Sequence, residues 1–239
     1  MRVQVQRTKR GPTANRLLAA LPAKSLEHLL ANSESIDLTF GDVLCLPGDR
    51  IRHVLFPVDS VISLVAPVDG YAGLEVGMIG SEGMFGIGLM LGVDDSPMHA
   101  LVQGTGPALR MDAKRFCREL EATPALRRGL NRYLHVLISQ LAQTAACTRF
   151  HVVEARLARW LLMTRDRVRS DEFYLTQDFL SHMLGVRRVG VTKAARSLQK
   201  RKLISYSRGA ITILHGSGLE AAACGCYLAD RKTYDRILG

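Results

Sequence analysis

The chain has 239 residues, a length that suits one large domain or two of modest size. Hydrophobic residues make up 47% and charged residues 23% of the sequence, a balance that excludes a largely disordered chain, a coiled-coil rod and a disulfide-rich miniprotein. The most apolar stretch, residues 84–93, is far shorter than the roughly 20 residues of a membrane-spanning helix, so we expect no membrane segment.

The net charge of +10 is unevenly distributed along the chain. Residues 1–16 carry five cations and no anion, residues 17–150 have a net charge of −3, and residues 151–239 have a net charge of +8. This asymmetry indicates domains with different partners. We expect the first 16 residues to form a flexible basic arm, because they are polar and contain Gly11 and Pro12.

The hydrophobic periodicity changes twice after this arm. Leucines at helical spacing predict two short helices within residues 17–30. Between residues 36 and 111, six short β-rich runs (43–46, 54–56, 61–65, 74–78, 100–102 and 109–111) alternate with turns that contain glycine. Many short strands with such turns are typical of a small antiparallel sandwich or barrel. Helical spacing returns at residues 113–120.

A long amphipathic helix is predicted over residues 125–148, followed by another over residues 152–168. The long helix carries leucines at the 4-3-4 spacing of a heptad seam: Leu130, Leu134, Leu137 and Leu141. Such a seam suits a partner helix in a dimer. An amphipathic helix that packs on its own sandwich gives the same spacing, so the pattern favours neither interpretation.

Residues 176–200 carry the most specific pattern in the chain. Thr176 suits the N-cap of a first helix, and Gly185 suits its C-terminal end. Ser181, Gly185 and Val191 have the spacing of a helix-turn-helix, with a small residue where two helices cross, a glycine in the turn and an aliphatic residue six positions later. The second helix of this motif would place its N-terminal residues in the major groove of DNA.

Charge supports DNA binding by this motif. Residues 179–208 contain eight cations and no aspartate or glutamate, whereas a solvated helix face usually mixes both signs. Two alternating runs around Arg208 and Gly209 predict a β-hairpin placed as a wing, with a plain hairpin over a small core as the alternative. The residues expected to contact DNA are Thr176, Gln177, Arg187, Arg188, Val189, Gly190, Thr192, Lys193, Arg196, Ser207 and Arg208.

The cysteines and histidines predict neither a disulfide framework nor a metal site. The five cysteines are an odd number and the N-terminus has no secretory signal, so we expect reduced thiols in a cytoplasmic protein. Cys224 and Cys226 form a Cys-x-Cys pair that could bind a metal or sense oxidants. Two thiols are too few for a complete metal site, so buried helical cysteines are the simpler interpretation. The histidines lack metal-site spacing, and no nucleophile or phosphate-loop motif occurs, so we expect no enzyme.

The order of these parts resembles the cyclic-AMP receptor and fumarate-nitrate regulator (Crp/Fnr) family of bacterial transcription regulators. The resemblance covers about residues 17–215. It is carried most strongly by Leu175-Thr176-Gln177, Met183-Leu184-Gly185-Val186, Arg188, Val191-Thr192-Lys193 and Leu203-Ile204, and in the β-roll by Gly83-Met84-Phe85-Gly86.

This resemblance implies an α+β fold with an N-terminal double-stranded β-helix, the jelly roll of cyclic-nucleotide-binding domains, and a C-terminal winged helix-turn-helix. The implied parts are an arm at 1–16, an effector-binding β-roll at 17–123, a dimerisation helix at 124–150 and a DNA-binding domain with a C-terminal extension at 151–239. It also implies a homodimer on a palindromic operator in double-stranded DNA, a small-molecule effector, and RNA polymerase as a candidate partner.

Two departures from the family pattern change these expectations. Cyclic-nucleotide binders of the family place a glutamate where Ile87 stands and an arginine-serine or arginine-threonine pair near residues 96–99, so we expect cyclic AMP to bind weakly or not at all. Val189 replaces the glutamate of the family's second helix, so the operator should differ, while Arg188 keeps its place opposite guanine. The resemblance assigns the effector pocket to Gly83, Met84, Phe85, Gly86, Ile87, Ser96 and His99.

Two classes of function therefore compete. The first is a sequence-specific DNA-binding transcription regulator that an effector controls through the β-roll. The alternative is a small-molecule-binding β-roll that signals without binding an operator. An additional helix is expected within residues 218–239, and the sequence does not decide whether it packs on the winged domain or on a dimer partner.

Overall fold

The computed structural model describes residues 14–239, so most of the arm expected at residues 1–16 lies outside the described part. Its last residues join the fold. Asn15 is fully buried and accepts hydrogen bonds from the backbone amides of Leu17 and Leu18 at the start of α1 (Arg16–Ala19). In the described range, no helix has both the length and the apolar character to cross a membrane.

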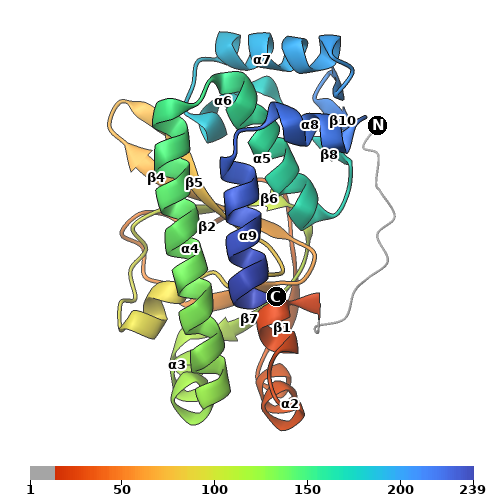
Figure 1. Ribbon diagram of the computed structural model, residues 1–239. Coiled ribbons are helices and arrows are strands. Elements are labelled where there is room, and N and C mark those ends of the chain that lie inside the picture. The colour runs from red at the N-terminus through yellow and green to blue at the C-terminus, as the bar shows by residue number, and fades with distance from the viewer. Residues whose placement is uncertain (1–13) are drawn as a thin grey trace.

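The N-terminal half is a β-roll of two antiparallel sheets (Figure 1). Their strand orders are β1-β7-β3 and β2-β6-β4-β5, and both sheets contribute to one apolar core. All six β-rich runs of the sequence are strands, while β1 and its mostly exposed residues gave no such signal. The strands are β1 (Glu34–Leu38), β2 (Val43–Cys45), β3 (His53–Pro57), β4 (Val61–Val68), β5 (Tyr71–Ile79), β6 (His99–Gly104) and β7 (Gly106–Asp112).

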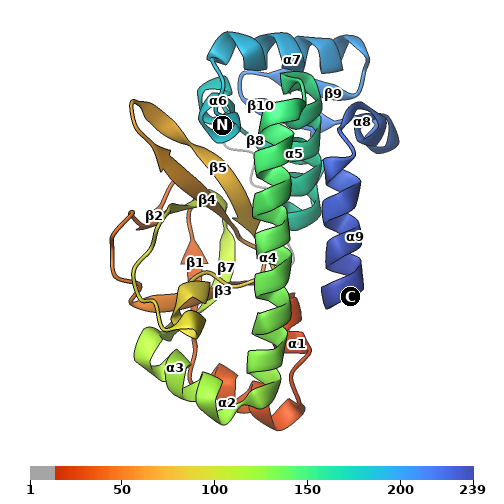
Figure 2. The ribbon, with the colours of Figure 1, turned by 60° about the vertical axis from the view of Figure 1, so that its left-hand side comes forward.

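Helices flank this roll. Figure 2 shows α2 (Ala23–Ala31) and α3 (Ala113–Ala122) at one end of the roll, and α4 (Pro124–Phe150) running along its side toward the C-terminal part of the chain. Pro124 stands in the first turn of α4, where its fixed φ suits a helix start. A 3₁₀ helix, η2 (Ile87–Leu91), follows the glycine-rich segment of the roll.

The leucine seam of α4 packs against its own β-roll. Leu130 and Leu137 are buried in the core of the roll, where Tyr133 joins them from the same helix face. Leu134 and Leu141 are half-buried. Of the two interpretations of this seam, packing on the chain's own β-roll holds for Leu130 and Leu137, so the assignment of these two leucines to the dimer interface is not supported.

The C-terminal part folds as a winged helix-turn-helix. The wing is a hairpin whose turn residues Arg208 and Gly209 both have positive φ, at 50° and 89°, as a two-residue hairpin turn requires. A short strand, β8, pairs with the wing and was not predicted. The elements are α5 (Val153–Val168), β8 (Glu172–Tyr174), α6 (Gln177–Leu184), α7 (Arg188–Lys200), β9 (Ile204–Ser207), β10 (Ala210–Ile213), α8 (Gly216–Ala222) and α9 (Cys226–Leu238).

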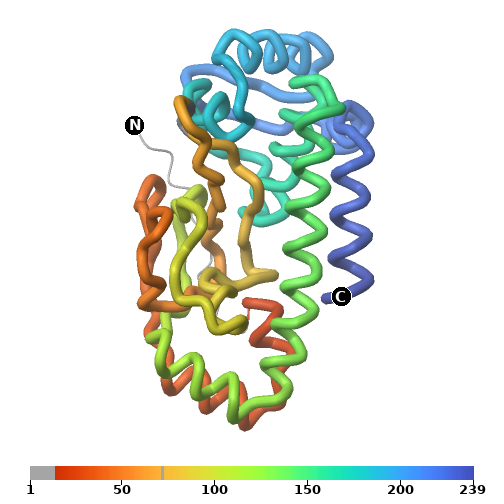
Figure 3. The backbone as a smooth tube through the Cα atoms, turned by 90° about the vertical axis from the view of Figure 1, so that its left-hand side faces the viewer, coloured from red at the N-terminus to blue at the C-terminus, as the bar shows by residue number. Residues whose placement is uncertain are grey.

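The last helix runs back toward the β-roll. In Figure 3, α4 lies between the β-roll and α9, and α9 runs beside the C-terminal part of α4, with which it is in contact. The C-terminal extension thus forms two helices where one was expected, and the second packs on the long helix of its own chain.

Candidate nucleic-acid interface

Local sequence signals build the helix-turn-helix. The hydroxyl of Thr176 accepts a hydrogen bond from the backbone amide of Phe179 and so caps α6. Gly185 ends α6 in the left-handed conformation, with φ of 60°, and its amide donates to the carbonyl of His182. The turn places α7 across α6, and the buried face of α7 includes Val191 and Leu198.

The opposite face of α7 is open and basic. Figure 1 shows this helix at one end of the molecule, with the rest of the winged domain to one side of it. Every lysine and arginine between positions 187 and 208 has an exposed side chain. Because the duplex backbone is a dense row of phosphates, an exposed row of cations on one helix suits a nucleic acid better than a partner of mixed charge. The exposed residues of the predicted set are Thr176, Arg187, Arg188, Val189, Lys193, Arg196, Ser207 and Arg208.

Three predicted contact residues interact within the motif. The hydroxyl of Thr192 lies 2.6 Å from Oε1 of Gln177, which joins α7 to α6. Both residues are half-buried, so in this state they position the helices. The guanidinium of Arg188 lies 3.5 Å from Asp178, but both side chains are more than 60% exposed. An ion pair this exposed contributes little free energy, so Arg188 can exchange the carboxylate for a base or a phosphate.

The wing is held against the motif by its own hydrogen bonds. The hydroxyl of Tyr206 donates to the carbonyl of Leu175 at 2.7 Å, and the amide of Leu175 donates to the carbonyl of Gly209 at 2.7 Å. Burial raises the pKa of Tyr206 to about 12, so its hydroxyl keeps the proton that this bond requires. Ser207 and Arg208 remain exposed at the tip.

The β-roll contacts the helix-turn-helix directly. Figure 2 shows the β4–β5 hairpin reaching α6. A Cβ atom on Gly185 would lie 2.9 Å from the side chain of Leu74 in β5. The rings of Phe179 and Phe40 are 5.4 Å apart between centroids. The turn of the DNA-binding motif therefore packs on the domain expected to sense the effector.

A buried polar network lies beneath this contact, and sequence reasoning missed it. Glu75 of β5 is fully buried and accepts hydrogen bonds from Ser63 of β4 and from the indole of Trp160 in α5, at 2.6 and 2.8 Å. Gln103 of β6 extends the network by donating to Thr164 of α5 at 2.9 Å. Burial raises the pKa of Glu75 to about 7, although both hydrogen bonds act to lower it.

Two buried ion pairs join α5 to the β-roll and to α9. Arg167 lies 2.8 Å from Glu82, which belongs to the loop just before the glycine-rich segment. Arg159 lies 2.7 Å from Asp230 of α9. All four side chains are at most about 10% exposed, so each arginine needs its carboxylate to offset the cost of burial. These pairs span 85 and 71 positions along the sequence, beyond the reach of local patterns.

The predicted effector segment forms part of the core of the roll. Met84 and Phe85 are buried, and Gly83 lies so close to Tyr133 of α4 that a Cβ atom there would be 2.5 Å from the ring. The hydroxyl of Ser96 donates to the carbonyl of Met98, within its own loop. A cleft of about 310 Å³ borders this segment through Ser81 and Glu82, between the roll, α5 and α9.

The structure places the buried Cys224 and Cys226 beside two further candidate metal ligands. Cys147 and His151 of the long helix lie beside Cys224 and Cys226, so four metal-ligating side chains form one group. The sequence showed only the Cys-x-Cys half of this group, because Cys147 and His151 lie beside it only once α9 is placed along α4.

Comparison with known proteins identifies the family of the C-terminal domain and the fold of the whole chain. Residues 155–222 match the Crp-like helix-turn-helix domain family. No protein of curated function matches the sequence significantly. Among solved structures, the c-di-GMP responsive global regulator CLP of Xanthomonas campestris is 18% identical, with a TM-score of 0.66 over 80% of this chain and 99% of its own.

Two further structures have the same fold. FixK2 of Bradyrhizobium japonicum is 10% identical, with a TM-score of 0.67 over 80% of this chain and 98% of its own. A transcriptional regulator of the Crp/Fnr family from Eubacterium rectale is 16% identical, with a TM-score of 0.65 over 86% and 96%. The predicted α+β fold is thus confirmed. Residues 155–222 are a Crp-like helix-turn-helix domain, and the chain as a whole has the fold of these Crp/Fnr-type structures.

Proposed function

We propose that the chain acts in the cytoplasm as a homodimer that binds a palindromic operator through the N-terminal half of α7. The observation that carries the proposal is the exposed basic face of α7. Arg187 and Arg188 stand at its start, where residues of a recognition helix reach base edges, and Lys193 and Arg196 follow on the exposed side. The wing tip adds a phosphate contact through Arg208.

The proposed dimer uses a face of α4 that the β-roll leaves open. Ile138 is 56% exposed at the middle of this face, although it is a large apolar residue. A second copy of α4 would bury Ile138. The two helices would be related by a two-fold axis, so that the same face of each copy contacts the other. The seven exposed positions at alternating spacings of three and four are Arg128, Asn131, His135, Ile138, Ala142, Ala145 and Arg149.

The proposed effector acts through the segment that includes Gly83, Met84, Phe85, Gly86 and Ile87. Glu82 precedes this segment and is ion-paired with Arg167 of α5, so a shift of the loop would be transmitted to the winged domain. We do not propose cyclic AMP as this effector, because Ile87 and His99 supply neither the carboxylate nor the guanidinium that a cyclic nucleotide needs. We propose no catalytic role, and RNA polymerase is a candidate partner at the operator.

An operator selection tests this proposal. Random duplex DNA is bound to the protein, recovered and sequenced, and the enriched site is measured by gel shift at several salt concentrations. We expect an inverted repeat with half-sites one helical turn apart, and affinity that falls steeply with salt. If no sequence is enriched, the protein does not read an operator, and the alternative of a β-roll that signals without DNA gains support.

A further inference from the structure

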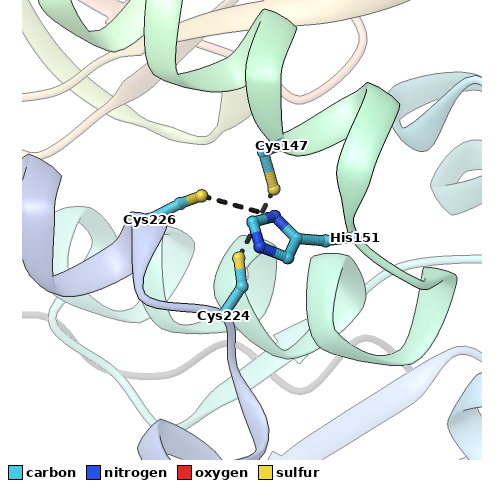
Figure 4. Close-up of side chains that lie close together, drawn as sticks. All are labelled: Cys147, His151, Cys224 and Cys226. Atoms are coloured by element: carbon cyan, nitrogen blue, oxygen red, sulfur yellow. Dashed lines mark hydrogen bonds between the residues drawn. The ribbon is translucent and has the colours of Figure 1, made fainter.

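A group of four metal-ligating side chains lies where α4, α5 and α9 meet, away from the basic face of α7 (Figure 4). Cys147 and His151 are four residues apart at the C-terminal end of α4, so they project to the same side. Cys224 and Cys226 come from the turn that leads into α9. One ligand atom from each residue lies within 4.8 Å of the other three.

We propose that Cys147, His151, Cys224 and Cys226 bind one Zn²⁺ ion. Zinc–sulfur bonds of about 2.3 Å and a zinc–nitrogen bond of about 2.0 Å in a tetrahedron place neighbouring ligand atoms roughly 3.5–3.8 Å apart. The Sγ atoms of Cys147 and Cys224 are 3.4 Å apart, and Sγ of Cys226 lies 3.5 Å from Nδ1 of His151. Three thiolates and one imidazole are a ligand set of closed tetrahedral zinc sites.

The short distances within the group also favour a single zinc ion over an iron–sulfur cluster. The ligands of a cluster bind different iron atoms and must stand around several metal and sulfide centres. Four ligand atoms that all lie within 4.8 Å of one another surround the space of a single ion. Soft thiolates exclude Mg²⁺ and Ca²⁺, which prefer oxygen ligands.

The surroundings of the group suit a metal thiolate. Nε2 of Gln143 donates a hydrogen bond to Sγ of Cys226 at 3.0 Å, an outer contact of the kind that orients metal ligands. Arg156 and Arg159 line a cavity beside Cys147. Arg159 is paired with Asp230, so the charge of Arg156 remains to offset the single negative charge of zinc bound by three thiolates. His151 is exposed while the thiols are buried, so an ion can enter from solvent past the imidazole.

The position of the site gives the ion a role beyond stability. His151 is the C-cap of α4, and its extended backbone turns the chain from the long helix into the winged domain. A bound ion therefore fixes this junction against the turn before α9. If the chain binds an operator as proposed above, zinc occupancy changes the position of α7 relative to α4 and therefore the affinity for the operator. The metal site itself does not depend on operator binding.

Cobalt substitution tests the site directly. The reduced, metal-free full-length chain is titrated with Co²⁺ and then with Zn²⁺. We expect one Co²⁺ per chain, with thiolate-to-cobalt charge transfer and the intense visible bands of tetrahedral coordination, and we expect one equivalent of Zn²⁺ to remove both. C226S should lose about a third of the thiolate charge-transfer intensity, because one of three thiolates is gone. C117S is the matched control and should keep the wild-type spectrum, because Cys117 lies in α3 outside the group.

A second variant covers the case in which C226S does not fold. H151Q changes an exposed side chain, so it should fold, retain the thiolate absorption and bind Co²⁺ more weakly than the wild type. Octahedral spectra, less than one tightly bound ion per chain, or a wild-type affinity in H151Q would overturn the proposal. So would a reduced protein that binds no metal and forms only a disulfide between Cys147 and Cys224 in air.

Gel shifts with and without zinc then separate the site from the proposed function. We expect zinc to change operator affinity in the wild type and to have a smaller effect in H151Q. Stoichiometric zinc binding with unchanged operator affinity would keep the site and reject its coupling to α7. Failure to bind any operator would reject the proposed function while the cobalt spectra still decide the metal site.

Discussion

The indole nitrogen of Trp160 donates a 2.8 Å hydrogen bond to the carboxyl group of Glu75 and thereby joins α5 to the β-roll. The hydroxyl of Ser63 lies 2.6 Å from Glu75 and 2.7 Å from Oε1 of Gln103, and it has one proton to give. A protonated Glu75 can donate to Ser63 while Ser63 donates to Gln103, which satisfies the chain of bonds. With a pKa of about 7, this carboxyl group changes charge near neutral pH at the contact between the two domains.

Glu75→Gln should remove a pH-dependent cost of folding. Because the pKa of Glu75 is about 7 in the folded chain and 4.5 as its ordinary value, the folded state binds more protons between these pH values. The contribution of Glu75 to stability is therefore fully present below about pH 4.5 and is lost as pH rises through about 7. Glutamine stays neutral and keeps the bonds, so we expect the variant to gain up to about 3 kcal/mol on the wild type across this range.

Urea unfolding of both proteins at several pH values measures this difference. Glu34→Gln is the matched control, because Glu34 pairs with Arg110 at the surface and an exposed ion pair contributes little to the free energy of unfolding. Parallel stability curves for Glu75→Gln and the wild type would mean that Glu75 does not titrate in this range.

Arg188→Ala should weaken operator binding by about 1–3 kcal/mol and relax the base preference at one position of each half-site. The side chain is exposed at the start of α7, where a bidentate contact to guanine is geometrically open. Arg201→Ala makes the same charge change, but its guanidinium is held by Glu154 at 3.0 Å, so a smaller loss is expected. Gel shifts on operator and random DNA measure both. Equal losses for Arg188→Ala on the two DNAs would make it a phosphate contact.

Gly185→Ala should destabilise the chain by about 1–2 kcal/mol, because a residue with a side chain resists the left-handed conformation. The added methyl group would also press on Leu74 and loosen the contact between the turn and the β-roll. Gly129→Ala in α4 is the control and should instead stabilise the chain. Space is open around Gly129, and alanine stabilises a helix by up to about 1 kcal/mol relative to glycine. Denaturant unfolding distinguishes the two, and equal effects would contradict the strain at Gly185.

Ile138→Glu should convert the proposed dimer to a monomer. Two glutamates would face each other across the two-fold axis in place of two apolar side chains, and like charges at such a seam repel. Sedimentation velocity measures the change. Leu91→Glu is the matched control, because Leu91 is 61% exposed on η2 and lies outside this face. A dimer that survives Ile138→Glu would place the interface elsewhere.

Cyclic AMP and cyclic GMP should leave the midpoint of thermal unfolding unchanged. A ligand that binds the folded state raises this midpoint with the logarithm of its concentration once that concentration exceeds the dissociation constant. The effector segment lacks an arginine for the cyclic phosphate, and Met84 and Phe85 occupy the core of the roll. A midpoint that rises by several degrees with increasing concentration of either nucleotide would show that other residues supply the missing charge.

The fold was predictable because its signals are local. The six runs of β residues, the N-cap at Thr176, the turn at Gly185 and the hairpin at Arg208 each depend on a few neighbouring positions. The strands β1 and β8 were missed because their residues are mostly exposed, so their sequences lack a buried alternation. Local chemistry thus determines most elements of this chain in the correct order.

The contacts between elements were not predictable in the same way. A heptad spacing identifies one face of α4 but not what covers it, so Leu130 and Leu137 suited a partner helix as well as the β-roll. Cys147 and Cys224 are 77 positions apart and meet only after α9 has folded back. In the sequence alone, Glu75 is one charged residue of a predicted strand, and nothing indicates that Trp160 donates a hydrogen bond to it. Such groups need tertiary structure to be recognised.

The return of α9 along α4 limits how the winged domain can move. A domain attached only through His151 and Val152 could swing as a rigid body about that one link. Here a swing would also drag α9 along α4 and separate Arg159 from Asp230, two buried charges that cannot be left apart. Packed helices slide past one another in small steps, because their side-chain ridges fit only certain grooves. We therefore expect α7, which moves with the winged domain, to shift by short translations between a few discrete positions. In the proposed dimer, the distance between the two α7 helices would then change only by small amounts.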